Sequence, residues 1–144
     1  MSLTGTYDDA NIFAKILRGE LPCIKAFEDE VALAFMDIFP QGRGHTLVIP
    51  KGAQARNLLD FPAEMFGPYL ERVQRVARAV TAALEPDGFQ ILQFNGAPAG
   101  QTVFHLHFHI IPRWDSVALA GHGHARRADD AELQDIARAI AAAM

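Results

Sequence analysis

Cysteine is nearly absent from this chain of 144 residues, in which Cys23 is the only one. One thiol can form no disulfide within the chain, and no Cys-x-x-Cys pair exists to hold a metal ion. Cys23 stands beside Pro22 and before an apolar run, a position typical of a small buried residue rather than of a nucleophile. A chain without disulfides fits a reducing compartment, and we expect it in the cytoplasm.

Positive charge is scarce as well, because 17 Asp and Glu residues outnumber 13 Lys and Arg, for a net charge of -4 with histidine neutral. This balance argues against a broad electrostatic surface for nucleic acid or for an anionic membrane. No apolar run approaches the roughly 18 residues of a membrane helix, and the first residues do not resemble a secretion signal. We therefore expect neither nucleic acid nor a membrane as a partner.

The apolar residues, which make up half of the chain, follow the spacing of one α+β domain. We assign residues 1–144 to it, with 1–7 as an N-terminal tail and 115–144 as a variable loop and helix. Helices are predicted near 12–17, after a cap at Asp8 or Asp9, from Pro62 to 84, and from Asp129 or Asp130 onward. Strands of an antiparallel sheet are predicted at 24–28, 31–36, 45–50, 89–94 and 103–111.

Half of the six histidines stand at alternate positions of the fifth predicted strand, as His105, His107 and His109. Successive side chains of a strand point to opposite faces, so the three imidazoles would share one face and the apolar residues between them the other. Three imidazoles without partners in an apolar core would be costly, which favours a functional role. His122 and His124 lie in a glycine-rich loop, where we predict a structural or surface role.

Two kinds of chemistry suit such an array of histidines. Histidine is a common zinc ligand, but no Cys or carboxylate follows at a ligand-like spacing. The other possibility is nucleophilic attack at phosphorus by a neutral imidazole, whose neighbours hold its tautomer and stabilise charge. Gln101 and Thr102, preceded by Gly96 and Gly100, offer an amide, a hydroxyl and backbone N–H groups that suit phosphate oxygens. Arg113, after the strand, either contributes a cation to the site or is a surface residue.

The stretch His105-Leu106-His107-Phe108-His109-Ile110-Ile111 fits the pattern His-φ-His-φ-His-φ-φ, in which φ is apolar. It resembles the histidine-triad (HIT) superfamily of nucleotide hydrolases and transferases. The resemblance covers roughly residues 8–114. It implies a HIT-like fold, with a five-stranded antiparallel sheet, one long helix, short flanking helices and a sheet extended across a homodimer. Four further stretches resemble the Hint-type branch in the same order: 11–22, 34–38, 44–51 and 99–104.

The resemblance also implies roles for the histidines. His107, the middle one, would attack the α-phosphorus of a nucleotide, expel the leaving group and form a nucleotidyl-histidine that water hydrolyses. His105 and His109 would flank the phosphate and orient His107. His45, which resembles an upstream fourth histidine of the family, would close the hydrogen-bond chain.

For the nucleotide itself, the resemblance implies seven further contact residues. Gln101 and Thr102 match positions that bond phosphate oxygens and the leaving group, and Asn95 matches a polar residue of the α-phosphate site. Asp37 would bind the ribose hydroxyls, with a turn or helix cap as the competing interpretation. Three apolar residues would form the slot for a purine, with simple core packing as their alternative: Phe13, Ile16 and Ile38.

The chain departs from its relatives at two places. Many bacterial relatives carry a Cys-x-x-Cys zinc pair in the first helix, where this chain has Asn11 and Ala14. We therefore predict no structural zinc and no cofactor. The ending Ile111-Pro112-Arg113 is more similar to bacterial and dinucleoside-polyphosphate-hydrolase forms than to the Gly-Gly ending of eukaryotic Hint proteins. The leaving group is therefore open between an amine, sulfate and a second nucleotide.

The resemblance thus implies a purine nucleotide phosphoramidase or nucleotidyl hydrolase that acts on an AMP conjugate and works as a homodimer. One alternative is a hydrolase of dinucleoside polyphosphates such as Ap3A or Ap4A. The other is a nucleotide-binding interaction protein with weak residual activity.

Overall fold

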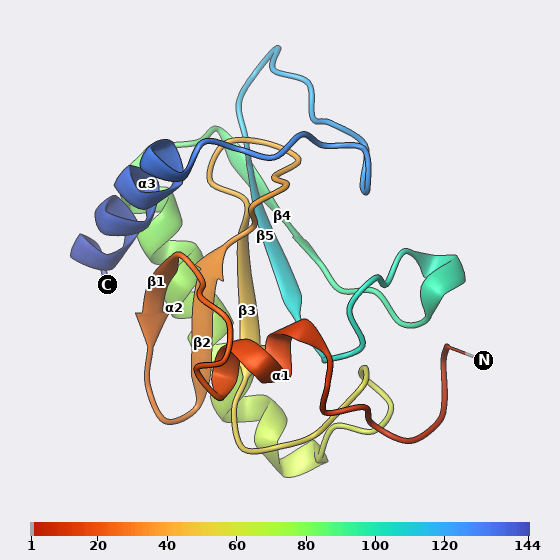
Figure 1. The fold of residues 1–144 in the computed structure, drawn as a ribbon. Coiled ribbons are helices and arrows are strands. Elements are labelled where there is room, and N and C mark those ends of the chain that lie inside the picture. The colour runs from red at the N-terminus through yellow and green to blue at the C-terminus, as the bar shows by residue number, and fades with distance from the viewer. Residues whose placement is uncertain (1) are drawn as a thin grey trace.

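Five strands form one antiparallel sheet in the computed structural model, which describes residues 2–144 (Figure 1). The strands stand in the order β1-β2-β3-β5-β4, so that β1 and β4 are the edges and β5 lies between β3 and β4. The predicted α+β architecture with an antiparallel sheet is thus confirmed. The strands are Lys25–Glu28 (β1), Ala32–Met36 (β2), Thr46–Pro50 (β3), Gly88–Leu92 (β4) and Phe108–Arg113 (β5).

Three α-helices accompany the sheet, and none within residues 2–144 is both long enough and apolar enough to cross a membrane. The last helix begins as predicted, because the Asp129 side chain caps it by accepting a hydrogen bond from the Glu132 N–H at 3.3 Å. The cytoplasmic location stays a prediction. The helices are Ile12–Leu17 (α1), Phe66–Leu84 (α2) and Asp130–Ala142 (α3), with short 3-10 turns at Ala63–Met65 and Ala97–Ala99.

The cap of α1 differs from the prediction. Asn11 is the N-cap, and its Oδ1 accepts a hydrogen bond from the Ala14 N–H at 2.9 Å. The predicted caps, Asp8 and Asp9, were wrong because they lie one turn too early. The Asp8 carboxylate instead accepts from the Ala10 N–H at 2.9 Å, which closes a turn just before the helix.

Helices cover both faces of the sheet, so every residue of β2 and β3 is buried. On one face, α2 and α3 pack with the sheet in an apolar cluster that includes Val48, Val76 and Ile136 (Figure 1). On the other face lies α1, whose Phe13 meets the ring of Phe35 edge-on at 5.3 Å between centroids. The short helix α1 is therefore stabilised by the sheet beneath it, as its length requires.

The fifth strand begins later than predicted, at Phe108, so His109 is the only member of the histidine triad within it. Pairing with β3 ends at Phe108 opposite Val48. Before that point the chain bonds elsewhere, and the Leu106 N–H donates to the Ala55 carbonyl oxygen at 2.9 Å. The predicted alternation survives, since Leu106 and Phe108 pack with the apolar cluster of α2 and α3.

The segment between β5 and α3 returns across the molecule beside the connection from β2 to β3. We call residues 115–128 the 115–128 loop. The Ala120 N–H donates to the Gln41 carbonyl oxygen, and the Ala128 N–H donates to the Ile38 carbonyl oxygen, both at 2.9 Å. These bonds bring the loop to the part of the sheet that carries the histidines.

Candidate active site

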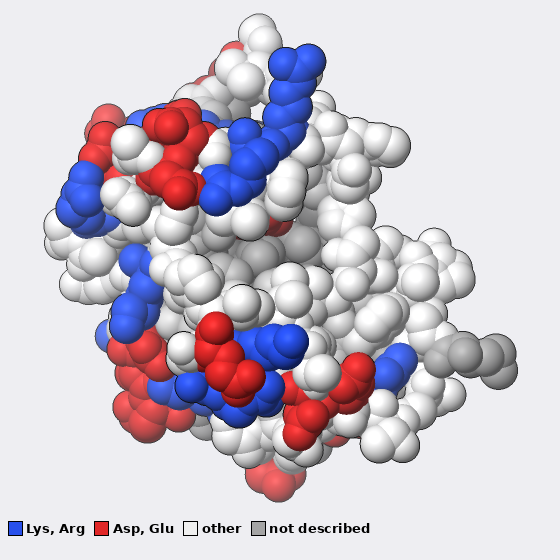
Figure 2. Space-filling model, viewed as in Figure 1, with Lys and Arg blue, Asp and Glu red and all other residues white. Residues whose placement is uncertain are grey.

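Four buried histidines lie together, and one of them, His45, lines a cavity of about 470 Å³. The walls of the cavity come from α1, from the segment after β2 and from the 115–128 loop. Figure 2 shows a hollow at the centre of this face, with most of the Lys, Arg, Asp and Glu side chains around it rather than in it. A ligand with a flat apolar part and a polar part beside the imidazoles suits such a cavity. The histidines are His45, His105, His107 and His109.

His107 has one ring nitrogen bonded and one available. Its Nδ1 lies 2.6 Å from the carbonyl oxygen of His105. A carbonyl oxygen only accepts, so Nδ1 carries the hydrogen and Nε2 has a free lone pair. The ring of Phe13 meets the His107 ring edge-on at 4.9 Å between centroids and restricts its rotation. The arrangement presents a neutral imidazole as a nucleophile or a base.

His105 is bonded to the protein on both sides of its ring. Its Nε2 lies 3.3 Å from the Pro50 carbonyl oxygen and must carry the hydrogen, so its Nδ1 accepts from the Tyr7 hydroxyl at 2.6 Å. Tyr7 belongs to the predicted N-terminal tail, which is held here by Arg56, whose guanidinium donates to the Ser2 carbonyl oxygen at 2.8 Å. His105 therefore supports His107 through its backbone.

His45 and His109 form a second chain of hydrogen bonds. The backbone N–H of Gln41 donates to His45 Nδ1 at 3.0 Å, so His45 carries its hydrogen on Nε2. That hydrogen points to His109 Nδ1 at 2.9 Å, which leaves the hydrogen of His109 on Nε2. Among the residues that the structure describes, His109 Nε2 is one of three buried side-chain atoms without a hydrogen-bond partner. A buried, unpaired N–H suits an anionic ligand.

Burial lowers the pKa of all four histidines, because a buried imidazolium loses the water that stabilises its charge. The pKa falls to about 4 for His45, His105 and His107, and to about 2 for His109. For His109, repulsion from neighbouring histidines adds to the effect of burial. The four rings are therefore neutral at pH 7, in the tautomers that their hydrogen bonds define.

Asp37, His45 and His109 place one ligand atom each within 4.8 Å of one another, which is close enough to consider a metal ion. The Asp37 carboxylate lies 3.5 Å from His45 Nε2. His45 Nε2 and His109 Nδ1 are also joined by a hydrogen bond of 2.9 Å, which by itself accounts for the short distance between the two rings.

The residues predicted to form the nucleoside slot lie together in the cavity wall, and their contact with a nucleoside stays a prediction. Phe13, Ile16, Asp37 and Ile38 all line it. Phe13 is buried and also packs in the core, whereas the Ile38 side chain is exposed. Asp37 caps a turn, which was the competing interpretation of this residue, because its Oδ1 accepts a hydrogen bond from the Phe39 N–H at 2.8 Å. Its Oδ2 remains on the cavity side near His45.

Of the predicted phosphate-binding side chains, only Thr102 lines the cavity. The Gln101 amide is buried, with its oxygen on the Gly96 N–H at 2.8 Å and its nitrogen on the Arg56 carbonyl oxygen at 2.7 Å. The Asn95 oxygen accepts from the Leu58 N–H at 2.9 Å. Gln101 and Asn95 therefore hold the backbone around the site, and their direct contact with phosphate stays a prediction.

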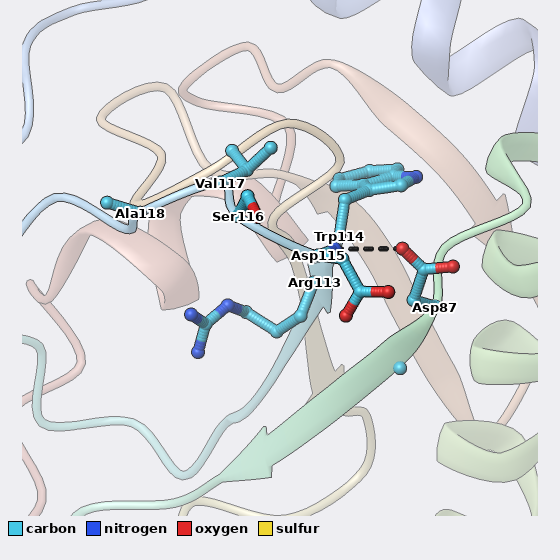
Figure 3. A pocket seen from close by; sticks show the side chains of 8 residues that line it. Asp87, Arg113, Trp114, Asp115, Ser116, Val117 and Ala118 are labelled. Carbon is cyan, nitrogen blue, oxygen red and sulfur yellow. Dashed lines mark hydrogen bonds between the residues drawn. The ribbon is translucent and has the colours of Figure 1, made fainter.

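Arg113 lies elsewhere. It lines a separate hollow of about 580 Å³ at the end of β5, formed with Asp87 and the start of the 115–128 loop (Figure 3). Figure 3 shows its side chain pointing away from Trp114. The backbone N–H of Asp115 donates to the Asp87 carboxylate at 2.8 Å and fixes the turn after the strand. Arg113 is thus not among the residues that line the histidine cavity.

Sequence reasoning missed three residues of this site. Tyr7 and Gln41 carry no motif, and they contact His105 and His45 only after folding brings distant segments together. His122 was predicted to have a structural or surface role, but it lines the cavity and its ring lies 5.8 Å from that of His109. A histidine in a glycine-rich loop was the one available signal. His124, in contrast, is exposed as predicted.

The fold and the clustered histidines define a histidine-triad protein, and comparison with known proteins agrees. The family model of the HIT domain matches residues 18–116. Protein hit of Bacillus subtilis is 43% identical over 133 residues, which cover 90% of this chain and 91% of that protein. Adenosine 5'-monophosphoramidase HNT1 of Saccharomyces cerevisiae is 41% identical over 115 residues, which cover 80% of this chain and 70% of that protein.

A solved structure is similar over nearly the whole chain. The crystal structure of a Hit-like protein involved in cell-cycle regulation from Bartonella henselae has a TM-score of 0.88 and 46% sequence identity. The match covers 96% of this chain and 100% of that chain. The chain therefore belongs to the HIT domain family, as the histidine pattern predicts.

Proposed function

We propose that this protein hydrolyses conjugates of purine nucleoside monophosphates, with AMP phosphoramidates as the preferred class. The observation that carries the proposal is the tautomer of His107, which donates Nδ1–H to the His105 carbonyl oxygen and keeps the Nε2 lone pair free. With a pKa of about 4, this imidazole is an unprotonated nucleophile at pH 7. The similarity to a protein named Adenosine 5'-monophosphoramidase supports the substrate class.

The proposed reaction has two steps. First, His107 Nε2 attacks the α-phosphorus, and the bond from phosphorus to the leaving group breaks. The leaving group keeps the electron pair of that bond and takes a proton from water. Second, water attacks the phosphorus of the nucleotidyl-histidine and gives up a proton to the hydroxide left by the first step, while the electron pair of the phosphorus–nitrogen bond returns to Nε2. The products are the nucleoside monophosphate and the free leaving group.

His109 and the residues that line the cavity would bind and orient the nucleotide. The unpaired His109 Nε2–H would donate to an α-phosphate oxygen, where charge increases as the nucleophile attacks. Asp37 would accept hydrogen bonds from the ribose hydroxyls, and the slot of Phe13, Ile16 and Ile38 would hold the purine. Thr102 would contact the leaving group through its hydroxyl.

The test is to mix the protein rapidly with adenosine 5'-phosphoramidate, to quench the mixture in alkaline urea and to measure the intact mass. We expect AMP as the product and a transient species heavier by one adenylyl group, which peptide mapping places on His107. If AMP is not released, the proposed activity is wrong. If AMP is released but the peptide of His107 never carries an adduct, the covalent route is wrong.

A competition assay separates the phosphoramidase from the hydrolase of dinucleoside polyphosphates. An AMP-amine and Ap4A are offered together, and kcat/KM is determined for each. We expect the AMP-amine to have the higher value. A higher value for Ap4A would replace the phosphoramidase with the alternative function while keeping His107 as the nucleophile.

We also propose that two copies associate through α2 and the edge strand β4. Leu70 of α2 and Phe89 and Ile91 of β4 are large apolar side chains with exposed fractions of 43%, 45% and 41%. The two elements border one mainly apolar hollow of about 670 Å³. An apolar surface beside an edge strand favours pairing with another chain. This location supports the sheet extension that the family resemblance implies.

Analytical ultracentrifugation tests this interface. We expect the wild-type protein to sediment as a dimer and Phe89→Lys to sediment as a monomer, because a charge would have to be buried at the contact. Val117→Lys is a matched control, since Val117 is also exposed but lies in the 115–128 loop. A monomeric wild type, or a dimer that persists with Phe89→Lys, would contradict the proposed interface.

A further inference from the structure

His122 has both of its ring nitrogens bonded, although it belongs to a loop. Its Nε2 lies 2.6 Å from the Gly100 carbonyl oxygen, and its Nδ1 lies 3.1 Å from the side-chain nitrogen of Gln41. The carbonyl oxygen can only accept, so Nε2 carries the hydrogen and Nδ1 accepts from the Gln41 amide. A surface histidine without a role does not need two such partners from two distant segments.

The His122 ring also packs against the active site. It lies 4.9 Å from the ring of Phe94 and 5.8 Å from that of His109, with an angle of 85° between the two imidazoles. Two neighbours of His122 in the loop, Gly123 and Ala125, line the cavity with it. His122 therefore lies between the loop and the histidines of the site.

Gln41 connects this loop to the histidines of the site. Its carbonyl oxygen accepts from the Ala120 N–H at 2.9 Å, and its side chain donates to His122. Its own N–H donates to His45 Nδ1 at 3.0 Å, which begins the chain of hydrogen bonds to His109. One buried residue thus joins the loop to the group that sets the tautomer of His109.

The second partner of His122 lies at the phosphate end of the site. Gly100 has a φ of 106°, a left-handed conformation that favours glycine and turns the backbone before Gln101 and Thr102. Its carbonyl oxygen is held by His122. His122 therefore holds the backbone two residues before Thr102, which lines the cavity.

We propose that His122 is a positioning residue that docks the 115–128 loop on the active site and thereby completes the nucleotide-binding cavity. The proposal rests on the proposed function, in which this cavity holds the nucleotide. His122 needs no contact with the reacting atoms, because its nitrogens are bonded to Gln41 and Gly100. Its loss affects nucleotide binding first and the chemical step second.

Steady-state kinetics with an AMP phosphoramidate test this role on three variants. His122→Ala removes two hydrogen bonds, and we expect KM to rise by about tenfold or more, since each neutral hydrogen bond contributes about fivefold, while kcat changes less. His122→Gln keeps an amide donor near the position of Nε2 and is expected to restore part of the affinity. His124→Ala, in the same loop, is the matched control and is expected to match the wild type.

Amide hydrogen exchange of Ala120 without substrate provides a measurement that is independent of activity. Docking protects this amide through its bond to Gln41. The Ala120 amide is therefore expected to exchange at least several-fold faster in His122→Ala than in His124→Ala. Equal exchange rates and equal KM values for these two variants would overturn the proposal. If the two variants differ in exchange as expected but the wild type turns over no nucleotide, the docking role stands and the proposed function fails.

Discussion

The two histidines nearest the proposed phosphate site are held in opposite tautomers. His107 donates its Nδ1–H to a backbone carbonyl oxygen, whereas His109 accepts at Nδ1 from a second imidazole, that of His45. His107 therefore presents a lone pair at Nε2 and His109 presents a hydrogen. Their rings lie only 4.9 Å apart. The group behind each ring thus gives two identical side chains opposite hydrogen-bonding ends, as the proposed roles of nucleophile and donor require.

Removal of the proposed nucleophile is expected to have the largest effect. His107→Ala should lower kcat by more than about 10⁴-fold, beyond the range for loss of a general acid or base, because no other side chain replaces the covalent step. AMP binding, measured by calorimetry, should persist. Near wild-type turnover would contradict the assignment of His107. A variant that binds AMP and still restores the phenotype of a deletion would favour the interaction-protein alternative.

Removal of the proposed donor is expected to have the second largest effect. His109→Ala should lower kcat by roughly 10²–10³-fold, the usual loss for one donor to a developing anion. His45→Ala is a milder variant for comparison, because it leaves the His109 ring in place but no longer fixes which of its nitrogens carries the hydrogen. We expect it to lower kcat by about tenfold to hundredfold. If His45→Ala is as damaging as His109→Ala or worse, the donor role of His109 is wrong.

Acid would remove the difference between the two rings by favouring the unfolded state, in which both are protonated. The folded pKa values of the four buried histidines lie near 4 or below, whereas unfolded histidine has a pKa near 6.5. Below about pH 6.5 the unfolded state thus binds more protons than the folded state does. The histidines therefore make their full contribution to the free energy of unfolding above this pH and lose it as the pH decreases. Each such histidine should lower the free energy of unfolding by roughly 1 kcal/mol between pH 7 and 5.5.

Urea unfolding at pH 7.5, 6.5 and 5.5 measures this dependence. Replacing His45 by Gln should reduce the decrease, because one titrating group is lost, whereas His124→Gln should leave it unchanged. A free energy of unfolding that stays constant over this range would show that the histidines are not held neutral by burial.

Much of this comparison can be anticipated from sequence, but the tautomers cannot. The apolar spacing of β2 and β3 and the cap at Asp129 are local features, and the structure confirms them. The alternating histidines predict a shared face, yet the paired strand starts only at Phe108 because β3 ends its pairing there. The partners that set the tautomers come from far away, since Tyr7 and His105 are 98 residues apart. Their contact exists only in the folded chain.

Tyr7 offers the most selective test of the comparison and the smallest expected effect. Tyr7→Phe keeps the ring that lies 5.8 Å from the His105 ring but removes the hydroxyl that donates to His105 Nδ1. The loss of one hydrogen bond should lower kcat/KM by about threefold to tenfold. Since the His105 carbonyl oxygen is what fixes Nδ1–H on His107, this variant loosens the nucleophile without touching the donor.

Imidazole nitrogen-15 NMR distinguishes this positioning role from a loss of stability. In the wild type, His105 should be the Nε2–H tautomer, and in Tyr7→Phe it should become a mixture while His109 keeps its hydrogen on Nε2. The chain offers a matched control in Tyr69→Phe, which removes a hydroxyl bonded at 2.6 Å to the Val48 carbonyl oxygen in the core. Tyr69→Phe should lower stability and leave the His105 signal unchanged. If both variants change His105 alike, the effect comes from the fold, and Tyr7 has no specific role in preparing the nucleophile.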